Sequence, residues 1–338
     1  MAEESQAGQL AGIRRIGDID GTSVLCNTIV VASNAIPEDP LARAIVSTLL
    51  YYDIWDHPLT VQELFAFLPV NSLTLDEFRI RLGEVVSRGW VLQNGGYYHV
   101  GGKTADVVRQ RIHRARHARR MWFFARLSMH IIKRFPFVRG VMVSGDLSKN
   151  STGRSSDVDF FVVTAPGRLW IARTLLILFK KTFLLNRRKF FCLNYFATTD
   201  HLGLDEQNIF LATEVATLKP LYNRGIFLSC LQANPWIKEY FPNFDMTCLP
   251  MTKANERPSF LQRILELPFA LLPADALDHS LQKMMERLWA KRYPEHDEET
   301  RKRIFRCSRH ESRAYVGDFQ EKILARYDQR LRDFGVKA

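Results

Sequence analysis

Two aspartates separated by a single residue, Asp157 and Asp159, are the side chains of this chain with the clearest chemical potential. They lie near the end of the segment 138–163, in which a polar stretch after Ser144 and Gly145 joins two apolar runs. Successive strand side chains point to opposite faces, so both carboxylates are expected on one face. Paired carboxylates at the end of a buried strand are costly unless a cation neutralises them. Hard oxygen ligands therefore predict Mg²⁺, or Mn²⁺ in its place, bound by Asp157 and Asp159.

The spacing of a glycine and an Asp-x-Asp pair resembles a known signature. Gly145 is followed twelve residues later by Asp157-Val-Asp159, as in the nucleotidyltransferase superfamily. That superfamily includes DNA polymerase beta, the tRNA CCA-adding enzymes, poly(A) polymerases and the small aminoglycoside nucleotidyltransferases. The resemblance covers about residues 136–225, and it is greatest to a bacterial group with a winged-helix-like region before the catalytic domain. It implies transfer of a nucleoside monophosphate from a nucleoside triphosphate (NTP), with release of pyrophosphate.

The residues around the glycine fit the phosphate site that this resemblance implies. Gly145 has no Cβ, so the backbone can approach a triphosphate closely. Ser144, Ser148 and nearby N–H groups are candidates to donate hydrogen bonds to phosphate oxygens, and Lys149 would add a positive charge. We therefore expect Ser144, Gly145, Ser148 and Lys149 to bind the NTP, with Asp157 and Asp159 as catalytic metal ligands.

Two departures from the superfamily pattern leave a second interpretation open. Many members have serine directly after the glycine, where this chain has Asp146. Most active members also have a third acid on a later strand, and the strand expected at 189–197 has Asn194 at its centre. An amide can bind a metal but cannot act as a base at neutral pH. Either Asp200 or Glu214 supplies the third acid, or the fold is a weakened enzyme that senses nucleotide or RNA.

Composition narrows the partners without naming the acceptor. The net charge of +11 favours a polyanionic partner, so a nucleic acid or a protein acceptor is preferred over a cationic antibiotic. Five scattered cysteines without a C-x-x-C pair argue against structural zinc and against a disulfide scaffold. The chain shows no uncharged apolar run of membrane-spanning length and no secretory signal, which predicts a cytoplasmic protein without a membrane partner.

The pattern of expected elements predicts an α+β chain with four parts. These are a flexible N-terminal arm at 1–38, a winged-helix-like domain at 39–102, a nucleotidyltransferase domain with a small mixed sheet at 103–250, and a helical C-terminal region at 251–338. The apolar faces of the C-terminal helices, expected at 260–272, 277–289 and 298–334, need a cover. Either the nucleotidyltransferase core or a dimer partner would provide it.

The winged-helix-like prediction rests on three helices followed by a hairpin. Thr60 and Glu63 form a capping box, and Asn94-Gly95 predicts a tight turn. A winged helix often binds DNA through its third helix, which gives a third interpretation, a DNA-binding regulator. Here that helix mixes acids and arginines, and this favours a structural or protein-interaction module.

A strongly basic helix is expected at 104–134, with six arginines between 109 and 120. Val108, Ile112, Ala115 and Trp122 would form its apolar stripe. The basic face either contacts RNA or triphosphate, or is simply solvated. Its histidines, His113 and His117, have zinc-like spacing, but the flanking arginines disfavour a cation.

Several later residues are weaker candidates. Glu214 lies mid-helix among apolar residues, so it needs an arginine partner or a role in the site. Arg168 could reach phosphate, although a surface salt bridge is the simpler expectation. Tyr222, Asn223 and Arg224 follow in a segment that could contact the base or the ribose.

Overall fold

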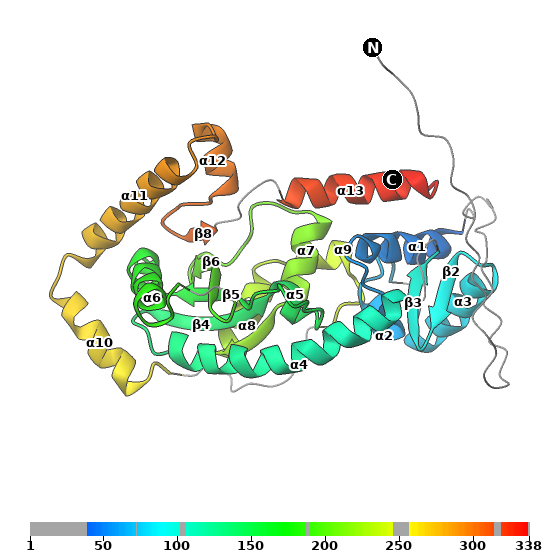
Figure 1. The fold of residues 1–338 in the computed structure, drawn as a ribbon, viewed down its shortest axis with the longest axis horizontal. Coiled ribbons are helices and arrows are strands. Elements are labelled where there is room, and N and C mark those ends of the chain that lie inside the picture. Colours follow the sequence, from blue (N-terminus) through cyan, green and yellow to red (C-terminus); the bar gives the residue numbers. More distant parts are fainter. Residues whose placement is uncertain are drawn as a thin grey trace, which may run out of the picture.

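The computed structural model describes residues 39–71, 73–101, 106–186, 189–245, 257–313 and 319–336. In these residues the protein is an α+β structure with thirteen helices, a three-stranded antiparallel sheet and a five-stranded mixed sheet (Figure 1). The expected N-terminal arm, 1–38, lies outside the described residues. None of the described helices combines the length and the apolar character that crossing a bilayer requires.

The N-terminal part is built of three helices and a small sheet. In chain order its elements are α1 (Pro40–Asp53), β1 (Leu59–Thr60), α2 (Val61–Ala66), α3 (Leu75–Ser87), β2 (Val91–Asn94) and β3 (Tyr97–Val100). The sheet has the order β1-β3-β2. Thr60 caps α2, and the side chain of Glu63 accepts a hydrogen bond from the Thr60 backbone N–H, so the predicted capping box is confirmed.

The hairpin turn lies one residue later than the sequence suggests. Asn94 pairs with Tyr97 as the last rung of the β2–β3 ladder, so Gly95 and Gly96 form the two-residue turn. Both have positive φ, 56° and 82°, which a glycine adopts without steric cost.

The long basic helix α4 (Asp106–Ile132) buries only part of the predicted apolar stripe, since Val108 is buried and Trp122 packs against a core cluster. Ile112, expected in the apolar stripe, is exposed, whereas Arg111 is 4% exposed. Arg111 forms an ion pair with Glu63 at 3.0 Å and donates to the Asn150 carbonyl at 2.8 Å. A buried guanidinium needs such partners, and the ion pair therefore ties α4 to the N-terminal part.

The five-stranded sheet is the centre of the fold. Its connected elements are β4 (Val138–Ser144), α5 (Gly145–Ser148), β5 (Asp159–Thr164), α6 (Leu169–Phe183), β6 (Cys192–Thr198), α7 (Ile209–Ala216), β7 (Lys219–Tyr222), α8 (Arg224–Gln232) and α9 (Ile237–Tyr240). The strand order is β7-β4-β5-β6-β8. β5 pairs antiparallel with β4 and parallel with β6. The sequence expectation of two buried strands at 138–163 is confirmed, although a one-turn helix, α5, starts directly at Gly145.

The two faces of this sheet belong to different hydrophobic cores. Phe160 and Val162 pack toward α4, α6 and α11 (Ala274–Arg292). Phe161 and Val163, one residue along, pack in the cluster that holds α7, α8 and α1. This alternation follows from the two-residue period of a strand. Because α1 and this face of the sheet belong to one cluster, the N-terminal part shares a hydrophobic core with the central sheet.

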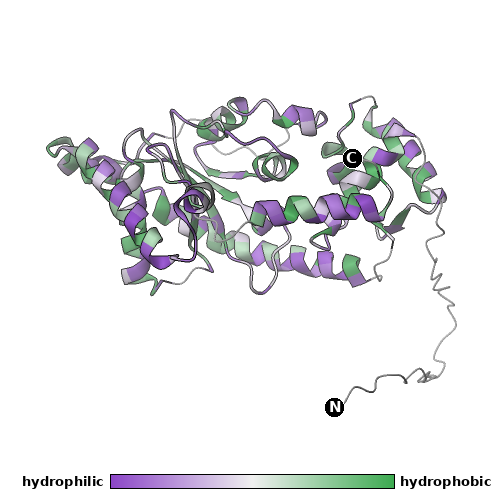
Figure 2. Cartoon of the chain, turned by 90° about the horizontal axis from the view of Figure 1, so that it is seen from above, coloured by the Kyte–Doolittle hydropathy of each residue, from purple (hydrophilic) through white to green (hydrophobic). Residues whose placement is uncertain are grey.

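The C-terminal region is not wholly helical. Besides α10 (Phe260–Ala270), α11, α12 (Glu298–Ile304) and α13 (Phe319–Asp333), it contributes β8 (Glu311–Arg313), which pairs antiparallel with β6 at the sheet edge. α11 packs on α6, and α13 packs on α1 and α7. Hydrophilic and hydrophobic residues alternate along these surface helices (Figure 2).

Helix α10 is an exception to the expectation that the core covers the C-terminal apolar faces. Its polar Gln262 is fully buried and donates to the Phe135 and Val138 carbonyls, and its Glu266 pairs with Arg139. The large apolar side chains of α10 remain exposed, with Phe260 at 79%.

Candidate active site

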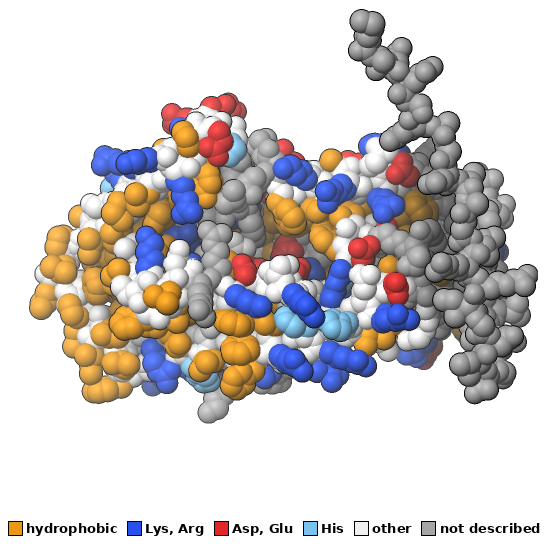
Figure 3. Space-filling model, in the orientation of Figure 1, with side chains coloured by type: hydrophobic (Ala, Val, Ile, Leu, Met, Phe, Trp, Pro, Cys, Tyr) orange, Lys and Arg blue, Asp and Glu red, His pale blue; other side chains and the backbone are white. Residues whose placement is uncertain are grey.

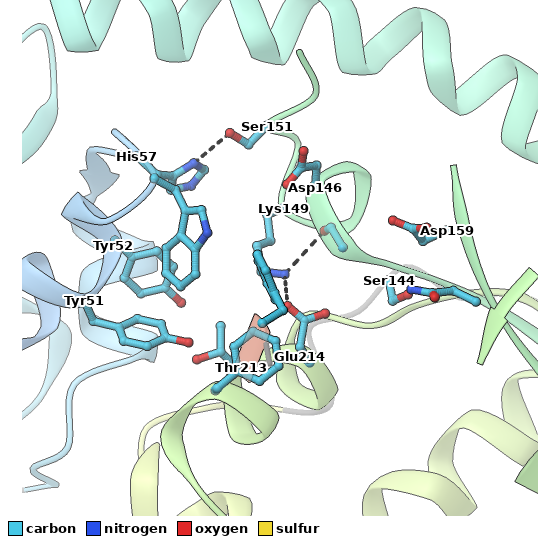
Figure 4. A pocket seen from close by; sticks show the side chains of 15 residues that line it. Tyr51, Tyr52, His57, Ser144, Asp146, Lys149, Ser151, Asp159, Thr213 and Glu214 are labelled. Atoms are coloured by element: carbon cyan, nitrogen blue, oxygen red, sulfur yellow. Dashed lines mark hydrogen bonds and ion pairs between the residues drawn. The ribbon is translucent and has the colours of Figure 1, made fainter. Parts of the chain in front are cut away.

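A cavity of about 200 Å³ lies where α1, α5, α7 and the starts of β5 and β6 meet (Figure 4). Its polar wall comes from the central sheet and from α7. The residues of that wall are Ser144, Gly145, Lys149, Asp159, Asn194 and Glu214. Sequence reasoning had placed four of these six in an NTP site, and the structure brings them to one wall.

Gly145 and Asp159 are in close contact at the base of this wall. They start from neighbouring strands, because Ser144 at the end of β4 pairs with Asp159 at the start of β5. Gly145 has φ of +66°, and a Cβ added there would lie 2.7 Å from Oδ2 of Asp159. Both the backbone conformation and the space therefore require glycine at this position.

The Asp159 carboxyl is held in an unfavourable place for a negative charge. Burial raises its pKa to about 7, and the charges of Glu214, Asp157 and Asp146 add to the increase. The thiol of Cys192, which is opposite Asp159 in the β5–β6 register, opposes it by hydrogen bonding. Burial and the same carboxylate raise the pKa of Cys192 to about 12, so the thiol keeps its proton.

Lys149 and Glu214 form an ion pair across the cavity. Nζ of Lys149 lies 2.7 Å from Oε1 of Glu214, and both side chains are about one fifth exposed. The sequence predicted an arginine partner or a role in the site for Glu214, and the observed partner is a lysine. An incoming phosphate would have to share Lys149 with this carboxylate, or displace it.

Asn194 occupies the wall at an irregularity of β6. The β5–β6 register runs from Phe160–Leu193 directly to Phe161–Tyr195, so Asn194 is the extra residue of a bulge. Asp200, the alternative third acid, lies beyond the opposite end of β6, where it pairs with His310 at 3.7 Å. Asp200 is therefore wrong as a candidate, and Glu214 is the acid that shares the cavity with Asp159.

Two of the predicted site residues do not line the cavity. Ser148 is buried, and its hydroxyl donates to the Gly145 carbonyl at 2.8 Å, so it closes the short helix α5. Asp157 precedes β5 and is not part of the wall, although its charge contributes to the raised pKa of Asp159. Asp146 departs from the superfamily pattern, and its charge would repel a triphosphate. Its carboxylate accepts a hydrogen bond from the Ser156 hydroxyl at 2.6 Å.

The donor set fits a hydrated divalent cation. No cluster of three or more His, Cys, Asp or Glu side chains arranged for a metal occurs in the described parts of the chain. Mg²⁺ commonly needs no such cluster, since it is held by one or two carboxylates together with substrate phosphates and waters. Asp159, with Asp157 beside it, is the pair that would hold it.

The opposite wall of the cavity is aromatic and was not anticipated from the sequence. It comes from the end of α1, with Tyr51, Tyr52 and Trp55, and is completed by Phe210 and Phe319. Tyr51 and Tyr52 direct their hydroxyls toward Thr213 and the cavity (Figure 4). The Tyr52 hydroxyl is buried and makes no hydrogen bond of normal geometry. A buried hydroxyl without a partner is costly, so this one marks a position where a ligand would be bound.

Removal of the Tyr52 hydroxyl should affect protein stability and NTP binding differently. Tyr52→Phe is expected to leave the free protein as stable as before, or more stable by up to about 1 kcal/mol, since only the contact of the hydroxyl with Thr213, which is not a hydrogen bond of normal geometry, is lost. The same change is expected to weaken binding of the Mg²⁺ complex of the preferred NTP about 5- to 10-fold. Thermal unfolding with and without NTP measures both effects. A fall in stability without NTP, or unchanged NTP binding, would contradict the assignment.

The loop that follows α5 is held by three side chains from two parts of the chain. His57 Nδ1, between α1 and β1, lies 3.0 Å from the Ser151 hydroxyl. From α4, His117 Nδ1 lies 3.0 Å from the Thr152 hydroxyl, and Arg111 donates to the Asn150 carbonyl. His117 therefore helps to fix the position of this loop.

His57 should make the stability of the protein depend on pH. Burial lowers its pKa well below the usual 6.5, and the charges of Arg111, Lys149 and Arg114 lower it further. As the pH falls through about 6.5, the His57 imidazole is therefore protonated in the unfolded chain but stays neutral in the folded protein. The contribution to stability is present above that pH and is lost as the pH falls, by up to about 1.4 kcal/mol per unit.

Urea unfolding at pH 7, 6 and 5 tests this dependence. His57→Gln is expected to lose less stability than the wild type over that interval. His113→Gln is the matched control, since that histidine is exposed on α4 and keeps its water contacts. Equal slopes for all three proteins would contradict the role given to His57.

The remaining candidates lie away from the cavity. Arg168 pairs with Asp275, which agrees with the simpler expectation of a salt bridge. Tyr222 is buried in the sheet at 3% exposure, and Asn223 donates to the Arg139 carbonyl at 3.0 Å. The expected contact of Tyr222 and Asn223 with a base or ribose is wrong, because both side chains are used for packing.

Comparisons of the chain with protein-family models, with curated proteins and with solved structures gave no significant match. The functional argument therefore rests on the residues and the geometry of the cavity.

Proposed function

We propose that this protein is a metal-dependent nucleotidyltransferase that moves a nucleoside monophosphate from an NTP to an acceptor. The observation that carries the proposal is the contact between Asp159 and Gly145. Gly145, with positive φ, begins a helix directly after β4, and the partly buried carboxylate of Asp159 begins β5. The backbone that a phosphate could approach therefore lies beside an oxygen that could bind a metal.

Each group of residues in the polar wall has a role in the proposed transfer. The acceptor hydroxyl gives up its proton to water and forms a bond to the α-phosphorus, while the bond from the α-phosphorus to the β-phosphate oxygen breaks and pyrophosphate leaves. Lys149 and Ser144 face the triphosphate and stabilise its charge. Asp159 and Asp157 hold the cation. When bound, divalent metal supplies positive charge at the attacking and leaving oxygens.

The aromatic wall gives the N-terminal part a role in the same site. Its helix and strand order is that of a winged-helix-like module, but the arginines of α3 are largely neutralised. Arg79 pairs with Asp76 at 2.7 Å, and Arg81 pairs with Glu84 and Asp39. This favours a module that completes the cavity through Tyr51, Tyr52 and Trp55 over a DNA-binding regulator.

A second candidate function is favoured by Asn194. The position on β6 where a third acid is expected carries an amide, and Lys149 is already paired with Glu214. A protein with this wall would bind NTP but transfer the nucleoside monophosphate slowly, and would act as a nucleotide or RNA sensor.

One experiment separates the two functions. The purified protein is incubated with each α-³²P-labelled NTP and Mg²⁺ or Mn²⁺, alone and with total bacterial RNA. Label on RNA or on the protein, lost on addition of EDTA, supports the transferase. NTP binding by calorimetry without any transfer or pyrophosphate release would instead support the sensor.

A further inference from the structure

The outer face of α4 carries a row of cationic side chains with little counter-charge. Between Val107 and Ile132 the helix contains seven arginines and no acidic residue. Arg111 and Arg114 point inward, where they bind backbone carbonyls of the site loop and of the turn after α1. The other five are exposed: Arg109, Arg116, Arg119, Arg120 and Arg126.

Helical spacing gathers this row into one stripe. Steps of three and four residues connect the positions 109, 113, 116, 120, 123, 127 and 130, all of which are exposed. The basic part, from 109 to 120, is about 16 Å long at 1.5 Å per residue. Arg116, Arg119 and Arg120 have no ion-pair partner among the described residues, and Arg109 has a distant one, Asp106 at 3.4 Å. Figure 3 shows basic and histidine side chains along α4, below the central hollow.

Aromatic and apolar side chains extend the stripe beyond the arginines. Phe123 is 64% exposed and Leu127 52% exposed, directly after the arginines. A basic track followed by an exposed aromatic ring is the combination with which proteins bind single-stranded nucleic acid, because phosphates pair with the cations and bases stack on the ring.

The stripe runs beside the loop that leads to the catalytic carboxylates. Trp122 donates to the Asn150 side chain at 2.8 Å, and Phe124 stacks on Phe190 at 4.3 Å. Past this contact, exposed Arg154 and Lys189 lie together, since Lys189 donates to the Arg154 carbonyl. The Lys189 carbonyl in turn accepts from Val158, the residue between the two aspartates.

We propose that α4, together with Arg154 and Lys189, binds the acceptor, and that the acceptor is a single-stranded nucleic acid. Its backbone lies along the arginine stripe and its end reaches Asp159. The identification of the bound nucleic acid as the acceptor rests on the proposed transferase function. The surface itself is tested by binding alone, which makes its failure distinguishable from a failure of catalysis.

The test is fluorescence anisotropy of a labelled 20-nucleotide single-stranded RNA between 50 and 200 mM KCl. The triple variant Arg116→Ala/Arg119→Ala/Arg120→Ala is expected to bind at least about 10-fold more weakly at 100 mM KCl. Its log–log salt slope should fall by about 2, since each lost phosphate contact removes about 0.7. Phe123→Ala should weaken binding about 10-fold with the salt slope unchanged.

A matched variant and a site variant complete the design. Lys283→Ala/Arg287→Ala/Lys291→Ala removes the same charge from the exposed face of α11 and should bind RNA as the wild type does. Asp159→Asn should also keep RNA binding, even where transfer is lost. Equal losses in both triple variants, no RNA binding at 50 mM KCl, equally tight binding of duplex RNA, or binding to anionic vesicles in place of RNA would each overturn the proposal.

Discussion

Replacing Asp159 with asparagine should reduce nucleotide transfer by about 1,000-fold or more. The change keeps the size of the side chain but removes the charge that would hold a cation against the triphosphate. A single lost electrostatic contact in such a site costs about 100- to 1,000-fold, and loss of the metal ligand acts on every phosphate oxygen that the metal touches. Initial rates of label transfer at saturating NTP measure the effect.

The same variant should not be less stable. In the free protein the Asp159 carboxyl is disfavoured as an anion, since burial raises its pKa to about 7. A neutral amide removes that penalty, so the unfolding temperature in EDTA should be unchanged or higher. Lost activity with retained stability therefore identifies a chemical role for the carboxylate.

Asp146→Asn is the matched control for Asp159→Asn. Asp146 is an exposed carboxylate at the rim of the same cavity, and the Ser156 hydroxyl already binds it. Its loss should change transfer less than about 10-fold. Activity of Asp159→Asn within tenfold of the wild type would exclude Asp159 as the metal ligand.

Replacing Gly145 with alanine should lower transfer about 100-fold while the protein stays folded. A left-handed conformation costs an alanine about 1–2 kcal/mol, and the new methyl group would lie 2.7 Å from Oδ2 of Asp159. The carboxylate must move, and a displacement of about 1 Å at a reacting centre is enough for a 100-fold loss. Transfer rates and the unfolding temperature should be measured together.

Two other glycines separate the causes of this loss. Gly96 has φ of +82° with open space around it, so Gly96→Ala reproduces the backbone strain without a contact at the site. Gly83 lies inside α3 with ordinary φ and no neighbour within 4 Å, so Gly83→Ala should stabilise the helix by about 0.5–1 kcal/mol. Both should keep full transfer. If Gly145→Ala were as active as Gly96→Ala, the contact with Asp159 would have no catalytic meaning.

Much of the local structure could be predicted from the sequence. Two apolar runs joined by a polar stretch were sufficient for the two central strands, and Thr60 with Glu63 was sufficient for the start of α2. These features depend on neighbours within a few residues, so a linear pattern contains them. For the same reason Gly145 and Asp159 could be proposed as one site, since a strand pair joined by a short segment brings its ends together.

The face of α4 and the partners of its arginines could not be predicted in this way. Ile112 and Arg111 are adjacent on the chain, and hydrophobicity alone assigns the isoleucine to the core. The opposite holds, because Glu63 and the Asn150 carbonyl, 48 and 39 residues distant, meet the guanidinium. Which buried charge is acceptable depends on such long-range partners.

The sequence by itself determined an α+β chain, its buried strands, its positive charge and the candidate residues for a metal and phosphate site. Only the tertiary structure decided which of them meet. Ser148 is used to close α5, Asp200 lies at the wrong end of β6, and Glu214 lines the same cavity as Asp159. The wall formed by Tyr51 and Tyr52 was also invisible, because an aromatic residue looks the same in a sequence whether it fills a core or lines a cavity.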